Sequence, residues 1–450
     1  MENIHLYIDK TQEENINILK KLVAQPSISA QNIGVKECAK ILYDIMIDIG
    51  IDTRIFETKT QPIVFGEIKS KNQNSITLLF YGHYDVQPPD PLEEWNTPPF
   101  EPTVFNKRLY GRGTGDNKGQ LLAHILAVRS FMNTVGCLPV NIKFVFEGEE
   151  ESGSPSLPEF VKEHRDMLNA DLVYFSDGTK HDSGAPIIFF GARGVLSLEI
   201  TLQTAKNDNH SGNKGGVIPN AAWKLVDLLS TMKDSKDNIT INGFYDNIVP
   251  PSEYELKLID EIPYDPNKLA KIFGVQELTL NRKEFYRRLM FEPTLTINGL
   301  ISGYTGIGGK TIIPGSAAVK MDARLVCNQD PNDIFNKIKD HVINYDPCAQ
   351  VIKHHCMYPS KTSADLQICE PVIRAVNKTH DQRPILFPSA GASSPDYVWT
   401  SVLGVPLLCV PYANADEANH APNENIVLDY YLNGIHTSAQ LIHELQTQKK

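Results

Sequence analysis

The stretch LLFYGHYDVQPP, residues 78–89, joins an apolar run to a histidine and an aspartate. The run ITLLFY, residues 76–81, has no polar alternation and predicts a strand that is buried on both faces. The run stops at Gly82, and His83 and Asp85 follow one residue apart. A buried strand that ends in His-x-Asp raises the question of what holds these two side chains there.

Helical and strand patterns alternate along the chain on both sides of this stretch. Apolar residues at helical spacing predict helices, and compact apolar runs predict strands. The predicted helices cover residues 10–24, 35–49, 117–133 and 156–168, and the further predicted strands cover residues 139–148 and 171–177. This alternation favours an α/β fold with a mainly parallel sheet and helices on both faces.

The pattern changes near Gly191. Residues 194–204 alternate like a half-exposed strand, and a helix over residues 221–232 follows. Two more strands, TLTINGL and AAVKMDARLV, and a helix near residues 331–344 complete this part. The mixture predicts a smaller α+β unit inserted in the chain, and the earlier pattern returns from about residue 366.

Length and composition indicate a soluble globular protein of two or three domains. The chain has 450 residues, of which 41% are hydrophobic and 22% are charged. The formal net charge is -11 and no basic run occurs beyond Lys449 and Lys450, which argues against a nucleic-acid partner because phosphates need clustered cations. No apolar run approaches the roughly 20 residues that span a bilayer, so no membrane partner is expected.

Two features predict a reduced, cytoplasmic protein. Residues 1–22 have the spacing of an amphipathic helix and lack the apolar core of a signal peptide. The seven cysteines are scattered and form no CxxC pair, which argues against a thiolate zinc site or a disulfide framework.

Candidate ligands follow three of the predicted strands, and ligands in open α/β sheets collect at the carboxyl ends of strands. They are His83 and Asp85 after the first strand, Glu149, Glu150 and Glu151 after the second, Asp177 after the third, Asp116 in the glycine-rich stretch GRGTGDNKG, and His420 in ANHAPNE. Each alone is typical of a polar turn, an acidic surface or a helix cap. Together they favour a cation site, because clustered acids repel one another and because imidazole and carboxylate ligands suit zinc, manganese or cobalt.

Three other motifs are incomplete. GRGTGDNKG lacks the third glycine of the dinucleotide fingerprint G-x-G-x-x-G, and GYTGIGGKT has Tyr304 where a phosphate loop needs glycine. GASSP, around Ser393, does not match the serine-hydrolase elbow G-x-S-x-G. These stretches therefore support neither a nucleotide site nor a serine nucleophile.

Six motifs, taken in order, resemble the M20 family of metallopeptidases. They are HYD (83–85), GRGTGDNKG (111–119), EGEEESGS (147–154), SDG (176–178), NHSG (209–212) and NHAPNE (419–424). The resemblance covers nearly the whole chain and is closest to the carnosinase-like and cytosolic non-specific dipeptidases. It implies a catalytic domain in two parts, residues 1–192 and 364–450, with an inserted lid and dimerisation domain over residues 193–363.

The resemblance also implies two divalent metal ions per chain, with zinc favoured and manganese or cobalt as alternatives. It gives His83 and Asp177 to one ion and Glu151 and His420 to the other. Asp116 is expected to bridge the two ions and to precede a cis peptide bond.

Two further roles follow from the same resemblance. Asp85 is expected to hydrogen-bond His83 and fix its tautomer. Glu150 is expected to act as the general base. Aligned on Ser152-Gly153-Ser154, Glu149 falls where relatives have a neutral or acidic residue.

For substrate binding, the resemblance implies His210 of NHSG, Arg324 of DARLV and Ser393 of GASSP. His210 is expected to stabilise the oxyanion from the neighbouring subunit of a homodimer, and the other two to bind the substrate carboxylate. At residues 389–395 the chain reads SAGASSP, where the dipeptidase pattern reads Arg-Glu-Gly-Gly-Ser-Ile-Pro. The expected activity is hydrolysis of dipeptides or small peptides, while N-acyl amino acid deacylation and a non-catalytic binding role stay open.

Overall fold

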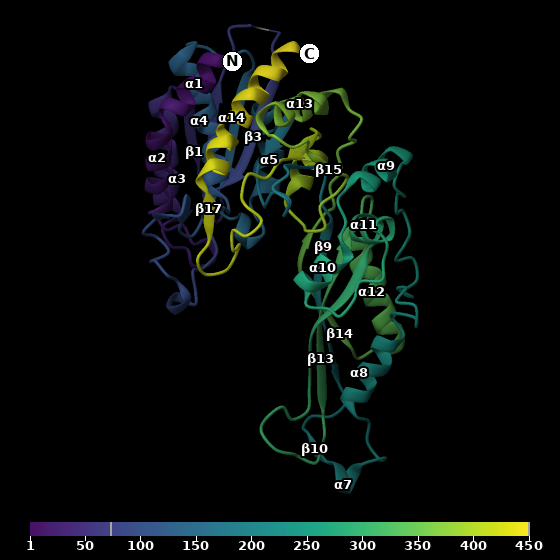
Figure 1. Cartoon of the computed structure of the whole chain (residues 1–450). Helices are drawn as coiled ribbons and strands as arrows, with labels where there is room; N and C mark the ends of the chain where they lie inside the picture. The colour runs from purple at the N-terminus through teal and green to yellow at the C-terminus, as the bar shows by residue number, and fades with distance from the viewer. Residues whose placement is uncertain (73, 449–450) are drawn as a thin grey trace. The chain divides into compact units, whose positions relative to one another are not determined.

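The computed structural model describes residues 1–72 and 74–448, and the chain forms two compact units (Figure 1). The first unit consists of Met1–Gly191, Lys361–Pro388 and Pro395–Lys450, and the second of Ala192–Ser360 and Ser389–Ser394. The second unit is therefore inserted in the first, and the short segment 389–394 also packs with it.

An eight-stranded sheet forms the centre of the first unit. Its order is β1 (Asp52–Phe56), β2 (Ile63–Ile68), β6 (Asn141–Glu147), β3 (Thr77–His83), β7 (Leu172–Phe175), β16 (Leu407–Cys409), β8 (Ile187–Phe189) and β15 (Ile385–Phe387). The four central strands, β6, β3, β7 and β16, run parallel to one another. The pairs β1–β2, β2–β6 and β16–β8 are antiparallel. The predicted mainly parallel sheet is confirmed.

Helices cover both faces of this sheet. Successive residues of β3 point to opposite faces, and since most of them are apolar, both faces need a layer that covers them. Leu78 and Phe80 belong to the core that contains α1 (Glu2–Lys10), α2 (Gln12–Val23), α3 (Val35–Ile49), α4 (Lys118–Thr134), α13 (Glu370–Thr379) and α14 (Leu428–Glu444). Leu79 and Tyr81 belong to the opposite core, with α5 (Leu157–Glu163), α6 (Arg165–Leu168) and η5 (Val398–Leu403). The unbroken apolar run of β3 is explained by burial on both faces.

Smaller elements complete the first unit. They are the three-stranded sheet of β17 (Asn425–Val427), β5 (Arg108–Tyr110) and β4 (Thr103–Phe105), and the short helices η1 (Ser29–Gln31), η2 (Leu92–Glu94), η3 (Glu150–Ser152), η4 (Gln367–Cys369) and η6 (Leu445–Thr447). Within the described residues, no helix is long and apolar enough to cross a membrane.

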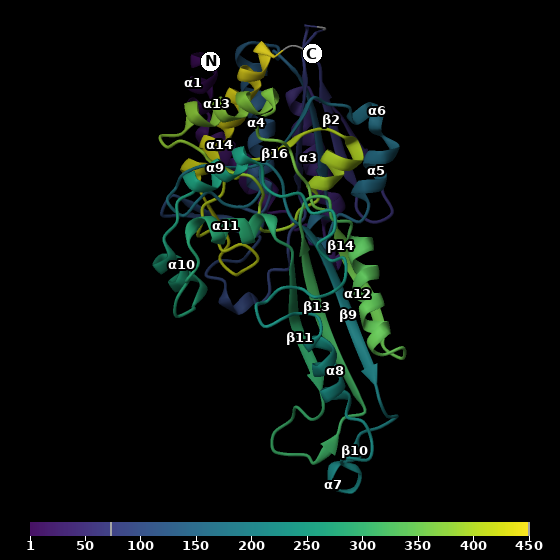
Figure 2. The same ribbon diagram turned by 90° about the vertical axis from the view of Figure 1, so that its right-hand side faces the viewer.

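The second unit is built on a four-stranded antiparallel sheet, whose long strands are seen in Figure 2. Its order is β11 (Thr294–Ser302), β13 (Ser316–Leu325), β9 (Gly194–Gln203) and β14 (Gln350–Met357). The burial of β9 alternates strictly, and its inward residues pack with α8 (Ala221–Ser230) and α12 (Pro331–Tyr345). The half-exposed strand predicted for residues 194–204 is therefore confirmed.

The second unit also holds elements that the periodicity did not predict. They are the helices α7 (Ser211–Lys214), α9 (Glu253–Glu261), α10 (Pro266–Phe273) and α11 (Arg282–Phe291), and the strand pair β10 (Asn209–His210) and β12 (Ile312–Ile313). The helices α9 and α11 each begin with a capping box, at Ser252 and at Asn281.

Candidate metal centre

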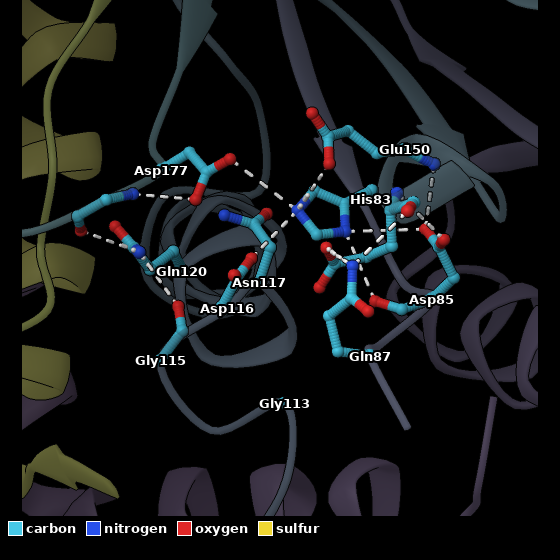
Figure 3. Close-up of polar contacts among 12 residues, drawn as sticks. His83, Asp85, Gln87, Gly113, Gly115, Asp116, Asn117, Gln120, Glu150 and Asp177 are labelled. Carbon is cyan, nitrogen blue, oxygen red and sulfur yellow. Dashed lines mark hydrogen bonds and ion pairs between the residues drawn. The ribbon is translucent and has the colours of Figure 1, made fainter. Parts of the chain in front are cut away.

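The first group of candidate ligands meets at the carboxyl ends of β3 and β7. His83 is the last residue of β3, and its Nε2 lies 3.1 Å from Oδ1 of Asp116 and 3.5 Å from Oδ2 of Asp177 (Figure 3). This nitrogen is buried and makes no hydrogen bond of regular geometry with the described residues. A buried imidazole nitrogen that faces two carboxylates without such a bond fits a cation between them.

The second group shares Asp116 with the first. Nε2 of His420 lies 3.1 Å from Oδ2 of Asp116 and 3.2 Å from Oε2 of Glu151. Asp116 thus turns one carboxylate oxygen toward each histidine. In each group the ligand atoms lie within 4.8 Å of one another. The five predicted ligands therefore come together as two groups joined at one carboxylate.

The charges of these groups favour cations. Burial raises the pKa of Asp177 and of Glu151, and the charge of Asp116 adds to both shifts. Hydrogen bonds to Asp116 and Glu151 raise the pKa of His420 to about 10. Burial lowers the pKa of His83, but its carboxylate partners outweigh burial and raise it well above 6.5. Because the acids attract positive charge and the donors are imidazole nitrogen and carboxylate oxygen, the residues fit two divalent ions.

Glu150 lies beside this cluster in η3. Its Oε2 is 4.0 Å from Nε2 of His83, and its side chain is 16% exposed. Burial raises its pKa well above the ordinary value, His83 opposes that shift, and Asp177 and Glu151 add to it. A carboxyl group with a raised pKa is suited to accept and return a proton near neutral pH.

Asp85 links the end of β3 to η3. Nδ1 of His83 lies 3.2 Å from the Asp85 main-chain oxygen and 3.4 Å from its Oδ1. The Asp85 carboxylate accepts the backbone N–H groups of Glu150 and Glu151, each at 3.1 Å. The sequence predicted only the contact with His83, whereas Asp85 also holds the two glutamates in place.

Glu149 is a structural anchor rather than part of the cluster. Its Oε1 accepts the backbone N–H of Ser156 at 2.7 Å. Its Oε2 accepts the N–H of Gln61 at 3.3 Å and the hydroxyl of Thr60. The side chain is buried and its acceptors are in use, so Glu150 and Glu151 are the two of the three glutamates that face the histidines.

Glu424 supports Asp116, a role that the sequence did not predict. Its carboxylate accepts the N–H groups of Gly113, Gly115 and Asp116 at 3.0–3.1 Å. Arg112 is equally buried and donates to it at 2.8 Å. The signal was available, because Glu424 ends the motif NHAPNE. The expected cis peptide bond after Asp116 is present.

The three predicted substrate residues lie in the second unit. Nη1 of Arg324 donates to Oγ of Ser393 at 2.7 Å, so these two are neighbours. His210 lies in β10, is exposed, and accepts the N–H of Gly212 at 3.1 Å through Nδ1. His210 makes no hydrogen bond to Arg324 or Ser393 among the described residues.

Arg193 stands next to this pair and was not predicted. It is 8% exposed and donates from Nε to the Gly391 oxygen at 2.8 Å. Burial and the charge of Arg324 lower its pKa to about 10. Two guanidinium groups therefore border the segment 389–394, and the only sequence signal is the arginine in GARGV at the start of β9.

Known proteins are similar in sequence to this chain over nearly its whole length. A "Cys-Gly metallodipeptidase" of Candida albicans is 30% identical over 97% of this chain and 95% of its own length. A mouse "Beta-Ala-His dipeptidase" is 28% identical over 100% of this chain and 96% of its own length.

Solved structures agree with this similarity. The M20 family metallo-carboxypeptidase Sso-CP2 from Sulfolobus solfataricus has a TM-score of 0.90 and 33% identity, covering 97% of this chain and 100% of its own. Human carnosine dipeptidase 1 has a TM-score of 0.79 and 27% identity, covering 99% and 100%. The profile of peptidase family M20/M25/M40 matches residues 79–444, so the chain belongs to this family.

Proposed function

We propose that this chain hydrolyses the peptide bond of dipeptides or small peptides and that it holds two divalent metal ions. The observation that carries the proposal is the position of Asp116 between two ligand groups, with Glu150 beside them. Membership of a peptidase family and similarity to proteins named as dipeptidases support the substrate class.

The proposed ligands are His83 and Asp177 for one ion, Glu151 and His420 for the other, and Asp116 for both. Zinc is favoured, and manganese or cobalt would satisfy the same donors. Bound ions would polarise the scissile carbonyl and lower the pKa of the attacking water.

Glu150 is proposed as the general base. Its carboxylate takes a proton from the attacking water and later gives it to the leaving amine. Its raised pKa and its lack of any hydrogen-bond donor among the described residues leave it available for both transfers. Asp85 holds Glu150 and His83 in place. Its carboxylate accepts the backbone N–H of Glu150, and its main-chain oxygen accepts the imidazole N–H of His83.

The carboxylate of the substrate is proposed to bind Arg324 and Ser393, with Arg193 as a second cation. Guanidinium groups bind carboxylates in a bidentate manner, and this site has two of them within one unit. We further propose a homodimer formed through the second unit, in which His210 donates to the oxyanion of the neighbouring subunit.

A carboxypeptidase acting on longer peptides is the second candidate. The Sulfolobus metallo-carboxypeptidase is 33% identical to this chain, a higher identity than that of the dipeptidases described above. Residues 389–395 depart from the dipeptidase pattern, and they lie next to Arg193 and Arg324, which are proposed to bind the substrate carboxylate. A change in this segment would alter the length of peptide that the site accepts.

A substrate panel on metal-loaded protein separates these candidates. The panel contains β-Ala-His, Cys-Gly, a tetrapeptide with the same C-terminal residue, and an N-acetyl amino acid. Cleavage of the dipeptides with kcat/KM at least tenfold above the other two supports the proposal. Preference for the tetrapeptide supports the carboxypeptidase, and cleavage of the N-acetyl compound alone would contradict both.

A further inference from the structure

A cavity of about 500 Å³ lies in the first unit, apart from the metal ligands described above. The loop after Asp177, the end of α13 and the start of α14 form its walls. The helices α13 and α14 pack against each other (Figure 1). The two walls of the cavity that these helices form are therefore held together by their packing. Its volume is in the range of small-molecule sites, which run from about 300 to 1,000 Å³.

Lys180 brings a buried positive charge to this cavity. The residue is 3% exposed, and the only side-chain hydrogen bond of its Nζ among the described residues is to Nε2 of His380, at 3.1 Å. The Tyr430 ring lies beneath the ammonium, with its centroid 4.0 Å from Nζ. No described carboxylate pairs with Lys180, although buried ammonium groups are ordinarily paired.

The tautomer of His380 makes it a neutral partner. Nδ1 of His380 lies 3.1 Å from the Val376 main-chain oxygen, which only accepts, and Nε2 faces the Lys180 ammonium, which only donates, so Nδ1 carries the proton. Nε2 therefore accepts a hydrogen from Lys180 and supplies no negative charge. Burial, with the charge of Lys180, lowers the pKa of His380 to about 4, so this imidazole stays neutral.

Two acids without cation partners line the same cavity. Asp381 follows α13 and Asp429 lies in the first turn of α14, and both are exposed. Neither carboxylate makes an ion pair or a side-chain hydrogen bond with the described residues. The cavity thus combines a buried cation that lacks an anion with two carboxylates that lack a cation.

We propose that this cavity binds a small zwitterion with an α-carboxylate on Lys180 and an α-ammonium between Asp381 and Asp429. Free amino acids and short peptides both carry this pair of charges, so the experiment includes both. The proposal concerns binding alone, and it does not depend on the reaction proposed above.

One chain segment, the loop after Asp177, leads from the metal centre to the cavity. Lys180 lies three residues after Asp177, and its N–H donates to the Ala413 oxygen at 2.9 Å. Gln120 joins the same segments, since it donates to the Gly178 oxygen at 3.0 Å and accepts the N–H of Tyr412 at 2.7 Å. A bound zwitterion would therefore contact the loop that leads from Asp177.

The test is ligand-observed NMR titration of the full-length, metal-loaded protein with glycine, acetate and methylammonium. Gly-Gly is titrated against the Glu150→Gln variant so that it is not consumed. We expect glycine to bind at least tenfold more tightly than acetate or methylammonium. The relative affinity of Gly-Gly identifies which zwitterion the cavity prefers.

Three variants assign the binding to this cavity. Lys180→Met keeps the length of the side chain and should weaken glycine binding at least tenfold. The double variant Asp381→Asn/Asp429→Asn changes only exposed residues and should remove the preference for glycine over acetate. Arg324→Ala, at the proposed substrate site, should leave the Lys180-dependent binding unchanged.

Thermal unfolding shows whether Lys180 has only a structural role. Because Lys180 is a buried charge without an anion, Lys180→Met should not lower the midpoint temperature. The proposal is overturned if Lys180→Met unfolds at a lower temperature and glycine affinity does not respond to the two aspartate changes. It is also overturned if acetate binds as tightly as glycine, or if Arg324→Ala removes the binding instead.

Discussion

Two sets of buried carboxylates lie at the same end of the first unit's sheet, and they differ in their donors. Glu424, Glu149 and Asp85 each accept two or more backbone N–H groups. The carboxylate of Glu150 accepts no hydrogen bond from the described residues, and that of Asp116 faces two histidines. The carboxylates that accept backbone N–H groups, here called the matched set, hold the loops in place. The carboxylates of Glu150 and Asp116, the unmatched set, accept no backbone N–H group in the described part of the chain, so their oxygens can bind a cation or a proton.

The largest effect is expected at Asp116, which belongs to both ligand groups. Asp116→Ala should remove both metal ions and reduce peptide hydrolysis to background, because neither group then has its shared oxygen. Elemental analysis after reloading checks this outcome. Asp90→Ala, next to the other cis peptide bond but outside both groups, is the control. Retention of two ions by Asp116→Ala would show that neither ligand group depends on the Asp116 carboxylate.

Glu150→Gln separates proton transfer from metal binding. Removal of the base should lower kcat by a factor on the order of 10² to 10⁴, while both ions stay bound. Measurement of kcat and metal content on one sample tests both parts. Loss of the ions together with activity would place Glu150 among the ligands instead.

Metal affinity should fall as the pH falls. Without a cation, the carboxylates hold protons on His83 and His420, whose pKa values are raised, the latter to about 10. A cation must displace these protons. For each proton displaced, the Kd of the cation should rise about tenfold for every unit by which the pH falls. Calorimetry in buffers of different ionisation enthalpy counts the protons. Release of no protons between pH 6 and pH 8 would contradict the described geometry.

Glu424→Gln tests a carboxylate of the matched set. The variant removes the charge that pairs with buried Arg112 and weakens the support of the Asp116 loop. Metal affinity should fall about 10–100-fold, as it does when groups that orient ligands are changed. A metal titration measures the affinity, and thermal unfolding measures the accompanying loss of stability. Unchanged metal affinity would show that Glu424 serves the fold alone.

The smallest effect is expected at Glu444, far from the cluster in sequence and paired with Arg374 and Lys378. Burial opposes ionisation, but Lys378, Arg374 and Gln440 lower its pKa to about 2. The lowered pKa means that the ionised carboxylate of Glu444 stabilises the folded state. This stabilisation is fully present above pH 4.5 and is lost as the pH falls toward 2. Glu444→Gln should cost about 1 kcal/mol at pH 7, since both partners are exposed. Glu370→Gln, an exposed carboxylate 3.5 Å from Arg374, should cost less.

The sequence predicted the fold best where periodicity was strong. The helix predicted over residues 35–49 is α3, and the strand predicted over residues 76–81 is β3. The helix predicted over residues 156–168 is divided into α5 and α6 at His164. The N-terminal stretch is likewise two helices, α1 and α2, which are separated at Thr11, where the backbone leaves helical geometry (φ −106°, ψ 17°).

Polar surface helices and edge strands were harder to predict. The strands β1 and β2 form an antiparallel edge, and β1 is partly exposed, so neither shows a long apolar run. The helices α9 and α11 are rich in charged residues and each buries only two apolar side chains, so their capping boxes were the better signals.

The ligand cluster was predictable because parallel strands bring their carboxyl ends to one edge. Its supporting contacts were not predicted, because neither strand ends nor helical periodicity indicate them, and the one signal for Glu424 was its place in the motif NHAPNE. Arg112 and Glu424 are separated by 312 positions, and Arg193 contacts Gly391 across 198. Neither spacing nor periodicity carries information on such pairs.

The most direct test of the two-metal site is the metal content of chelator-treated protein after reloading with zinc. The two ligand groups predict two ions per chain, with peptide hydrolysis restored in proportion to loading. Fewer than one ion per chain, or hydrolysis that survives complete removal of metal, would contradict it.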